Sequence, residues 1–254
     1  MSALIIPTAE PFFFPGDRIG CLLIHGFTGA PKEMLWMGEY LASQGHSVLG
    51  IRLAGHATQP SDMLRMRWRD WVASVEDGYH LLRHSTDHIF AIGLSMGGVL
   101  ALHHGANHPV SGIVAMSTPY SLGNDPRLPY AKYLHYLQPN ISKGASDWQN
   151  PDAAADHVDY PYYPTRAIAE LRDLLVEMRA ALPKIQVPVL LIHSRKDGGV
   201  LPLNAEQNFS HLQVEDKTLL WVENSGHVIT REPDRQQVFA AAEAFIQRVT
   251  ASHL

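Results

Sequence analysis

A serine flanked by glycines, in the stretch Gly93-Leu94-Ser95-Met96-Gly97, is the first candidate for chemistry in this chain. It follows the apolar run 89–94 and precedes a helical pattern. A strand, a sharp turn and a helix in this order can hold a serine hydroxyl above a sheet as a nucleophile. The glycines then leave room where the strand and the helix approach each other. A glycine-rich turn without chemistry is the alternative interpretation.

A serine hydroxyl is a weak nucleophile unless a base removes its proton, so a histidine and an acid are needed elsewhere. Asp197 follows the apolar run 187–193, and His227 follows the run 218–222. Both lie just past predicted strands, in the order serine, acid, histidine, and about one βαβ unit separates them. We predict a catalytic triad in which Ser95 is the nucleophile, His227 the base and Asp197 the acid that orients the base.

Other titratable residues compete for these roles. Asp125 follows the strand after Ser95 and is the second candidate for the orienting acid, whereas Glu223 is too close to His227 in sequence. His193 ends a predicted strand and could line the site. The helix after the serine carries three more histidines, His103, His104 and His108. Because no acidic or thiol partner accompanies them, we expect a solvated helix face rather than a metal site.

The first apolar run ends in "LLIHGFTGAP", which places His25-Gly26-Phe27 at the carboxyl end of a strand beside Ser95. The tetrahedral intermediate of acyl transfer needs hydrogen-bond donors for its oxyanion. We predict that the backbone N–H groups of Phe27 and Met96 supply them. A plain turn at the end of a strand is the alternative.

Short apolar runs alternate with longer helical patterns along the chain. Nearly continuous apolar runs are typical of strands buried on both faces of a parallel sheet, so we predict a doubly wound, mostly parallel α/β fold. The predicted strands are 19–25, 47–52, 88–94, 112–116, 187–193 and 218–222. The predicted helices are 32–44, 68–83, 98–107, 165–182, 203–212 and 235–249.

The stretch 121–164 breaks this alternation. It is rich in Tyr, Pro, Asn and Asp and shows no clear strand. A connection of this length without structure is improbable in a compact domain. We therefore predict a single domain over residues 1–254, with a small, partly helical cap inserted at about 121–164 over the functional edge of the sheet.

The composition is that of an ordinary globular protein. The chain has 254 residues, of which 46% are hydrophobic and 18% charged, and its formal net charge is −5. This charge offers no footprint for nucleic acid or anionic membranes. The single cysteine, Cys21, lies in an apolar run and is expected to be buried. Without a signal-like or membrane-spanning stretch, we expect a cytoplasmic protein with no integral membrane association.

Six stretches in order resemble the α/β-hydrolase superfamily, and within it the small bacterial carboxylesterases and monoacylglycerol lipases. They are "LLIHGFTGAPKEM", "IRLAGH", "DWVASVEDGY", "GLSMGG", "HSRKDGGV" and "NSGH". The resemblance covers about residues 10–250 and implies the same triad, the same two oxyanion donors and a cap after the strand ending near Met116. Relatives often have Gly-His-Gly where this chain has Gly55-His56-Ala57, and we expect His56 to be structural.

The expected activity is hydrolysis of short- to medium-chain acyl esters or monoacylglycerols through an acyl-enzyme, without a metal or organic cofactor. Another chemistry on this fold (acyltransferase, perhydrolase, C–C hydrolase or peptidase) and a non-catalytic binding protein are the alternatives. The expected lining of an apolar substrate pocket includes Phe27 and Met96. Further candidates for substrate contact are His25, Gly26, Tyr120, Leu134, Leu137 and Val200.

Overall fold

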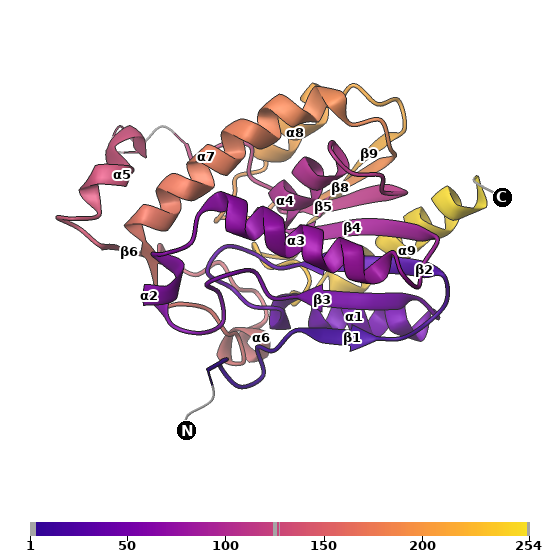
Figure 1. Ribbon diagram of the computed structural model, residues 1–254, viewed down its shortest axis with the longest axis horizontal. Helices are drawn as coiled ribbons and strands as arrows, with labels where there is room; N and C mark the ends of the chain where they lie inside the picture. Colours follow the sequence, from indigo (N-terminus) through magenta and orange to yellow (C-terminus); the bar gives the residue numbers. More distant parts are fainter. Residues whose placement is uncertain (1–3, 124–125, 127, 253–254) are drawn as a thin grey trace.

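A seven-stranded sheet in the order β1-β3-β2-β4-β5-β8-β9 forms the centre of the computed structural model, which describes residues 4–123, 126 and 128–252 (Figure 1). Its strands are β1 (Phe12–Phe14), β2 (Ile19–Ile24), β3 (Ser47–Ile51), β4 (His88–Leu94), β5 (Gly112–Met116), β8 (Val189–Ser194) and β9 (Lys217–Val222). Strand β1 pairs with β3 antiparallel, and all other neighbours in this sheet are parallel. The predicted mostly parallel α/β fold is confirmed.

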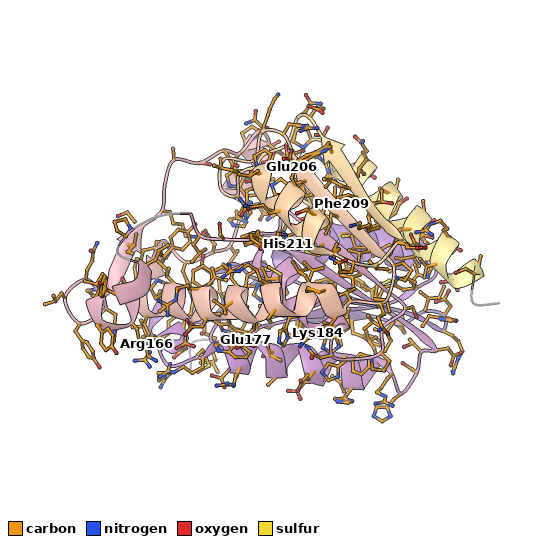
Figure 2. The ribbon with its side chains drawn as sticks, turned by 90° about the horizontal axis from the view of Figure 1, so that it is seen from above. Arg166, Glu177, Lys184, Glu206, Phe209 and His211 are labelled. Carbon is orange, nitrogen blue, oxygen red and sulfur yellow. The ribbon has the colours of Figure 1, made fainter. Side chains whose placement is uncertain are left out.

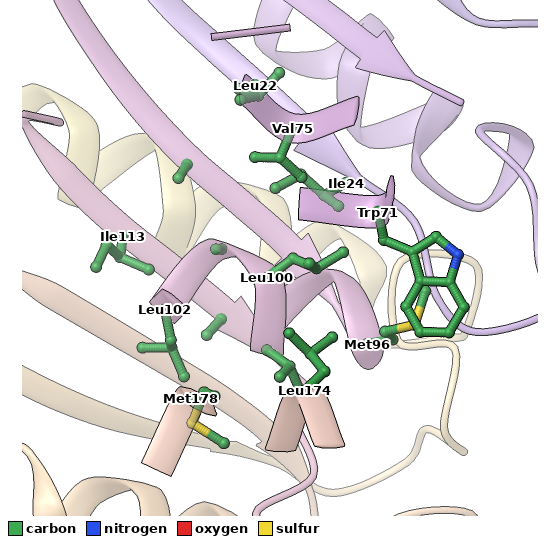
Figure 3. Close-up of a cluster of buried hydrophobic side chains, with 14 of the residues drawn as sticks. Leu22, Ile24, Trp71, Val75, Met96, Leu100, Leu102, Ile113, Leu174 and Met178 are labelled. Carbon is green, nitrogen blue, oxygen red and sulfur yellow. The ribbon is translucent and has the colours of Figure 1, made fainter. Parts of the chain in front are cut away.

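Helices cover both faces of the sheet because successive residues of a buried strand point to opposite sides. In β2, Leu22 and Ile24 belong to a core with α3, α4 and α7, part of which Figure 3 shows, whereas Cys21 and Leu23 face α1 and α9. Helix α8 packs on β8 and β9. The longer helices are α1 (Lys32–Ser43), α3 (Trp68–Leu82), α4 (Met96–Gly105), α7 (Thr165–Ala181), α8 (Leu203–His211) and α9 (Arg235–Ala251), and α2 (Pro60–Met63) is a single turn.

Strands β4 and β5 coincide with their predicted ranges, and the other predicted strands differ by one or two residues at one end or, for β8, at both. Helix α4 begins at Met96, two residues before its predicted start. Strand β1 was not predicted, because a three-residue run between Pro11 and Pro15 is too short to show any periodicity. It is an edge strand of the sheet, where flanking prolines interrupt no hydrogen bonds between strands.

The described part of the 121–164 segment contains short elements only. These are the 3-10 turn η1 (Leu128–Tyr130), α5 (Ala131–Leu134), β6 (Asn140–Ser142), α6 (Pro151–Ala155) and β7 (Tyr162–Pro164). Strands β6 and β7 pair antiparallel, although the sequence showed no strand here, because three-residue strands leave no pattern. Asp125, the second candidate for the orienting acid, lies outside the described residues.

The two halves of this segment lie against different parts of the molecule. The first half lies along the beginning of α7, where the N–H of Thr165 donates to the carbonyl of Pro139 at 2.9 Å. Figure 2 shows α7 crossing the molecule from Arg166 to Glu177, with η2 (Leu182–Lys184) at its end and α8 beside it. The second half, around α6, lies at the lower edge of the molecule in Figure 1. Among the described residues, no helix is long and apolar enough to cross a membrane.

Candidate active site

Ser95 occupies a strained turn between β4 and α4. Its backbone has φ 55° and ψ −118°, a region that residues with a side chain rarely adopt. Its N–H donates to the carbonyl of Met116 at 2.8 Å. A Cβ placed at Gly93 would lie 2.0 Å from the carbonyl oxygen of Gly97, and one at Gly97 would lie 2.0 Å from that of Ile24. Strand and helix therefore approach closely at both glycines, as the spacing predicted.

Three side chains meet at the carboxyl end of the sheet. The Oγ of Ser95 lies 2.9 Å from Nε2 of His227. The Nδ1 of His227 lies 2.9 and 3.0 Å from the two carboxylate oxygens of Asp197. In this geometry the carboxylate accepts from Nδ1–H, so Nε2 is left free to accept the serine proton. The structure thus brings the three predicted residues into one hydrogen-bonded chain.

Asp197 is a buried, ionised carboxylate. It is 2% exposed, and one of its oxygens accepts hydrogen bonds from the N–H groups of Gly199 and Val200 at 2.9 and 2.7 Å. Burial alone would raise its pKa, but the charge of His227 and hydrogen bonds from His193 and His227 outweigh burial and hold the pKa well below its usual range. A carboxylate in this state can stabilise an imidazolium without taking up its proton.

The surroundings of His227 favour its positively charged, protonated form. Its side chain is 21% exposed. Burial lowers its pKa, but the charge of Asp197, the hydrogen bond to that carboxylate, and the charges of Asp147 and Glu33 together raise the pKa above its ordinary value. The site therefore stabilises the protonated form that a general base reaches during catalysis.

The two predicted oxyanion donors lie next to Ser95. Met96 is the first residue of α4, so its N–H has no carbonyl partner inside the helix. A Cβ at Gly26 would lie 3.4 Å from Cβ of Ser95, which places the Gly26–Phe27 peptide beside the serine. The peptide groups that carry the two predicted donors thus both lie beside Ser95.

Glu33, in the first turn of α1, holds the loop that carries Phe27. Its Oε2 accepts from the N–H of Gly26 at 2.7 Å, and its Oε1 lies 3.6 Å from Nε2 of His157. Burial raises the pKa of Glu33 to about 7, although the hydrogen bond from Gly26 lowers it; the charge of Asp159 also raises this pKa, and those of His227 and Lys143 lower it. The sequence interpretation did not include Glu33, although an acid in the first helical turn after a glycine-containing loop is a recognisable signal.

His25, a predicted substrate contact, is instead a buried support. It is 0% exposed, its Nε2 accepts from the N–H of Leu53 at 3.1 Å, and its ring lies 5.1 Å from that of His56. Burial lowers the pKa of His56 to about 4, and its ring also contacts Trp71, as expected for a structural residue. The side chain of His25 therefore has no surface to offer a substrate.

The other predicted substrate contacts are scattered. Tyr120 contacts α7 and α8: its hydroxyl lies 3.2 Å from Nε2 of His211, and its ring lies 5.5 Å from the guanidinium of Arg179. Leu137 is 87% exposed, so it does not enclose a substrate in this arrangement. Leu134 is half-buried in α5, at the outer end of α7 (Figure 1). Val200 is half-buried and directly follows the loop of Asp197.

The histidines of α4 do not form the solvated face that was expected. His104 is 1% exposed, and its ring stacks on that of His108 at 4.3 Å and contacts Tyr79. Burial lowers the pKa of His104 to about 3, so it is neutral near pH 7. The prediction failed because α3 covers this part of α4, which spacing along α4 cannot show. Met96 is also fully buried, beside Trp71 in Figure 3, so its side chain belongs to the core.

Comparisons with known proteins identify the family of this chain. The family model described as serine aminopeptidase, S33, matches residues 17–234. The chain belongs to this family. A relative, the thermostable monoacylglycerol lipase of Bacillus sp. (strain H-257), is 34% identical over 96% of both chains. The carboxylesterase of Bacillus subtilis (strain 168) is 29% identical over 96% of this chain and 98% of its own.

Solved structures give the same assignment. A structure described under LipS and LipT, two metagenome-derived lipolytic enzymes, matches with a TM-score of 0.91 and 32% identity, over 96% of this chain and 99% of the other. This S33 protein is therefore a hydrolase of the α/β-hydrolase fold.

Proposed function

We propose that this S33 protein hydrolyses carboxylic esters through an acyl-enzyme on Ser95. The observation that carries the proposal is the position of His227, which lies within hydrogen-bond distance of Ser95 on one side and of Asp197 on the other. A serine without a neighbouring base is a weak nucleophile, and a non-catalytic binding protein does not require such a base.

In the first half of the reaction, Ser95 Oγ attacks the ester carbonyl carbon while its proton passes to Nε2 of His227. The carbonyl electrons move to the oxygen, which the N–H groups of Phe27 and Met96 stabilise. When the intermediate collapses, the bond to the alcohol oxygen breaks and His227 gives its proton to the leaving alcohol. Water then attacks the acyl-enzyme by the same steps, and the acid leaves with Ser95 regenerated.

The substrate class is a small ester with an apolar acyl group, either a short- to medium-chain ester or a monoacylglycerol. Phe27, at the oxyanion position, is half-buried and is flanked by aromatic rings, with Trp71 at 6.0 Å and Tyr163 at 5.7 Å between centroids. Such surroundings favour apolar groups. Relatives named monoacylglycerol lipase and carboxylesterase support the same class.

The test is a series of p-nitrophenyl esters from acetate to palmitate, together with a monoacylglycerol, assayed with the wild type and Ser95→Ala. We expect turnover that peaks at short or medium chains and is absent in Ser95→Ala. A fluorophosphonate probe should label the wild type only. If no ester is turned over while a peptide or a diketone is, the proposed ester hydrolase is wrong. Adding a second alcohol and analysing the products distinguishes hydrolysis from acyl transfer.

A further inference from the structure

One carboxylate from the 121–164 segment reaches both loops that carry the acid and the base. The Oδ2 atom of Asp147 accepts a hydrogen bond from the N–H of Gly198 at 2.9 Å. The same oxygen accepts from the N–H of His227 at 2.9 Å. Gly198 directly follows Asp197, and His227 is the base itself. A single oxygen therefore joins the loop after β8 to the loop after β9.

Close packing accompanies these two hydrogen bonds. A Cβ placed at Gly226 would lie 2.4 Å from the carbonyl oxygen of Asp147 and 2.9 Å from its Cγ, so the backbone before His227 lies directly against Asp147. Any larger residue at position 226 would push the two apart. The backbone of Asp147 as well as its carboxylate therefore takes part in the contact with the loop of His227.

The residues after Asp147 fasten the same stretch to the chain beyond His227. The N–H of Gln149 donates to both carboxylate oxygens of Glu232 at 3.1 Å. The side-chain amide of Asn150 donates to the carbonyl of Arg231 at 2.9 Å. Asp147 is therefore held in place by its own neighbours, as a residue must be if it is to position another one.

We propose that Asp147 is a positioning residue of the active site, which sets the distance between His227 and Asp197 by accepting hydrogen bonds from the backbone of both loops. The inference rests on the proposed roles of Ser95, Asp197 and His227. Without this acceptor, two N–H groups lose a charged partner and the two loops lose their direct link.

Asp147 also acts on the base by its charge. The charged groups that face His227 are Asp197, Asp147 and Glu33, and each of the three raises its pKa. A purely structural residue at position 147 would support folding but would have no reason to change the titration of the base. This difference provides a readout that separates positioning from general support.

The test compares Asp147→Ala with Asp147→Asn, and uses Asp152→Asn as the matched control. Asp152 has an exposed side chain in the first turn of α6, so its substitution removes the same charge from the same segment. Asparagine at position 147 keeps an acceptor oxygen and loses the charge, whereas alanine loses both. The readouts are kcat and KM with a p-nitrophenyl ester, the pH profile of kcat/KM, thermal unfolding, and the downfield Nδ1–H proton resonance of His227.

For Asp147→Ala we expect kcat to fall roughly 10- to 100-fold, with a smaller change in KM, because misplacement of a catalytic group costs this much. The Nδ1–H resonance should weaken in the same variant. Asp147→Asn should keep most of kcat and shift the acidic limb of the pH profile to lower pH, because a negative charge beside His227 is lost. Asp152→Asn should behave like the wild type.

The proposal is overturned if Asp147→Ala has wild-type kcat, or loses activity only in proportion to its unfolded fraction. If Asp147→Ala does not fold, Asp147→Asn decides, and an unshifted acidic limb in that variant overturns the proposal. A wild type that hydrolyses no ester contradicts the proposed function instead. The two failures are therefore distinguishable.

Discussion

Two buried carboxylates lie near Ser95, on the loop after β8 and in the first turn of α1, and their pKa values move in opposite directions. Asp197 is 2% exposed and Glu33 is 5% exposed. Asp197 accepts from two backbone N–H groups and faces His227, whereas Glu33 accepts from one and is close to the negative charge of Asp159. The pKa of Asp197 is lowered, and that of Glu33 is raised to about 7. Two carboxylates of similarly low exposure thus ionise differently, because burial dominates at Glu33, whereas the charge of His227 and the hydrogen bonds outweigh burial at Asp197.

The largest effect is expected where the carboxylate must be ionised. Asp197→Asn should lower kcat by a factor on the order of 10⁴, because an amide holds the wrong tautomer of His227 while leaving the fold intact. Steady-state kinetics with an ester, together with circular dichroism, measures this. Asp125→Asn serves as the control, and a loss of this size in the control instead would assign the orienting acid to Asp125.

The pH profile of the reaction tests the different ionisation of Asp197 and Glu33. His227 must be neutral to accept the serine proton, and its pKa is raised above 6.5. The pH profile of kcat/KM should therefore have an acidic limb, set by protonation of His227, whose midpoint lies above pH 6.5. Below this midpoint kcat/KM should fall about tenfold per pH unit. Glu33→Gln should move that limb to lower pH, because a negative charge near the base is removed. An unchanged limb in this variant would show that Glu33 is neutral throughout the range.

Glu33 should also affect stability, in the direction opposite to Asp197. Its folded-state pKa of about 7 lies above the ordinary value of 4.5, so the folded state holds the proton between these values. The protonated Glu33 therefore adds to the free energy of unfolding at low pH. This stabilisation is lost as the pH rises from about 4.5 to about 7, and it amounts to about 3 kcal/mol at most. Denaturant unfolding at pH 5 and pH 8 should show a smaller loss for Glu33→Gln than for the wild type. An equal loss in both proteins contradicts the raised pKa.

The smallest effect concerns the conformation of the Phe27 loop. Thr28 is buried with φ 62°, and its hydroxyl has no hydrogen-bond partner among the described residues. Thr28→Gly should relieve roughly 1–2 kcal/mol of strain. The greater flexibility of unfolded glycine offsets about half of this, so we expect stabilisation below about 1 kcal/mol. Thermal unfolding measures it, and a clear destabilisation would show that the Thr28 methyl group is needed for packing.

The sequence by itself determined the sheet and the order of the loops at its carboxyl edge. The predicted ranges of β4 and β5 are confirmed, because long buried apolar runs bounded by turns report local structure directly. The same patterns place Ser95, Asp197 and His227 at strand ends, and the parallel sheet then brings these ends together. The edge strand β1 and the small β6–β7 sheet were missed, because three residues carry no period.

Only the tertiary structure decided which other side chains meet the triad and in which charge state. Asp147 and His227 are 80 residues apart, and nothing in an irregular segment marks the aspartate that joins the two loops. The burial of His25 and His104 and the exposure of Leu137 likewise depend on what packs over them. The physical reason is that periodicity describes the neighbours of a residue along the chain, whereas burial, hydrogen-bond partners and pKa values come from segments that are distant in sequence.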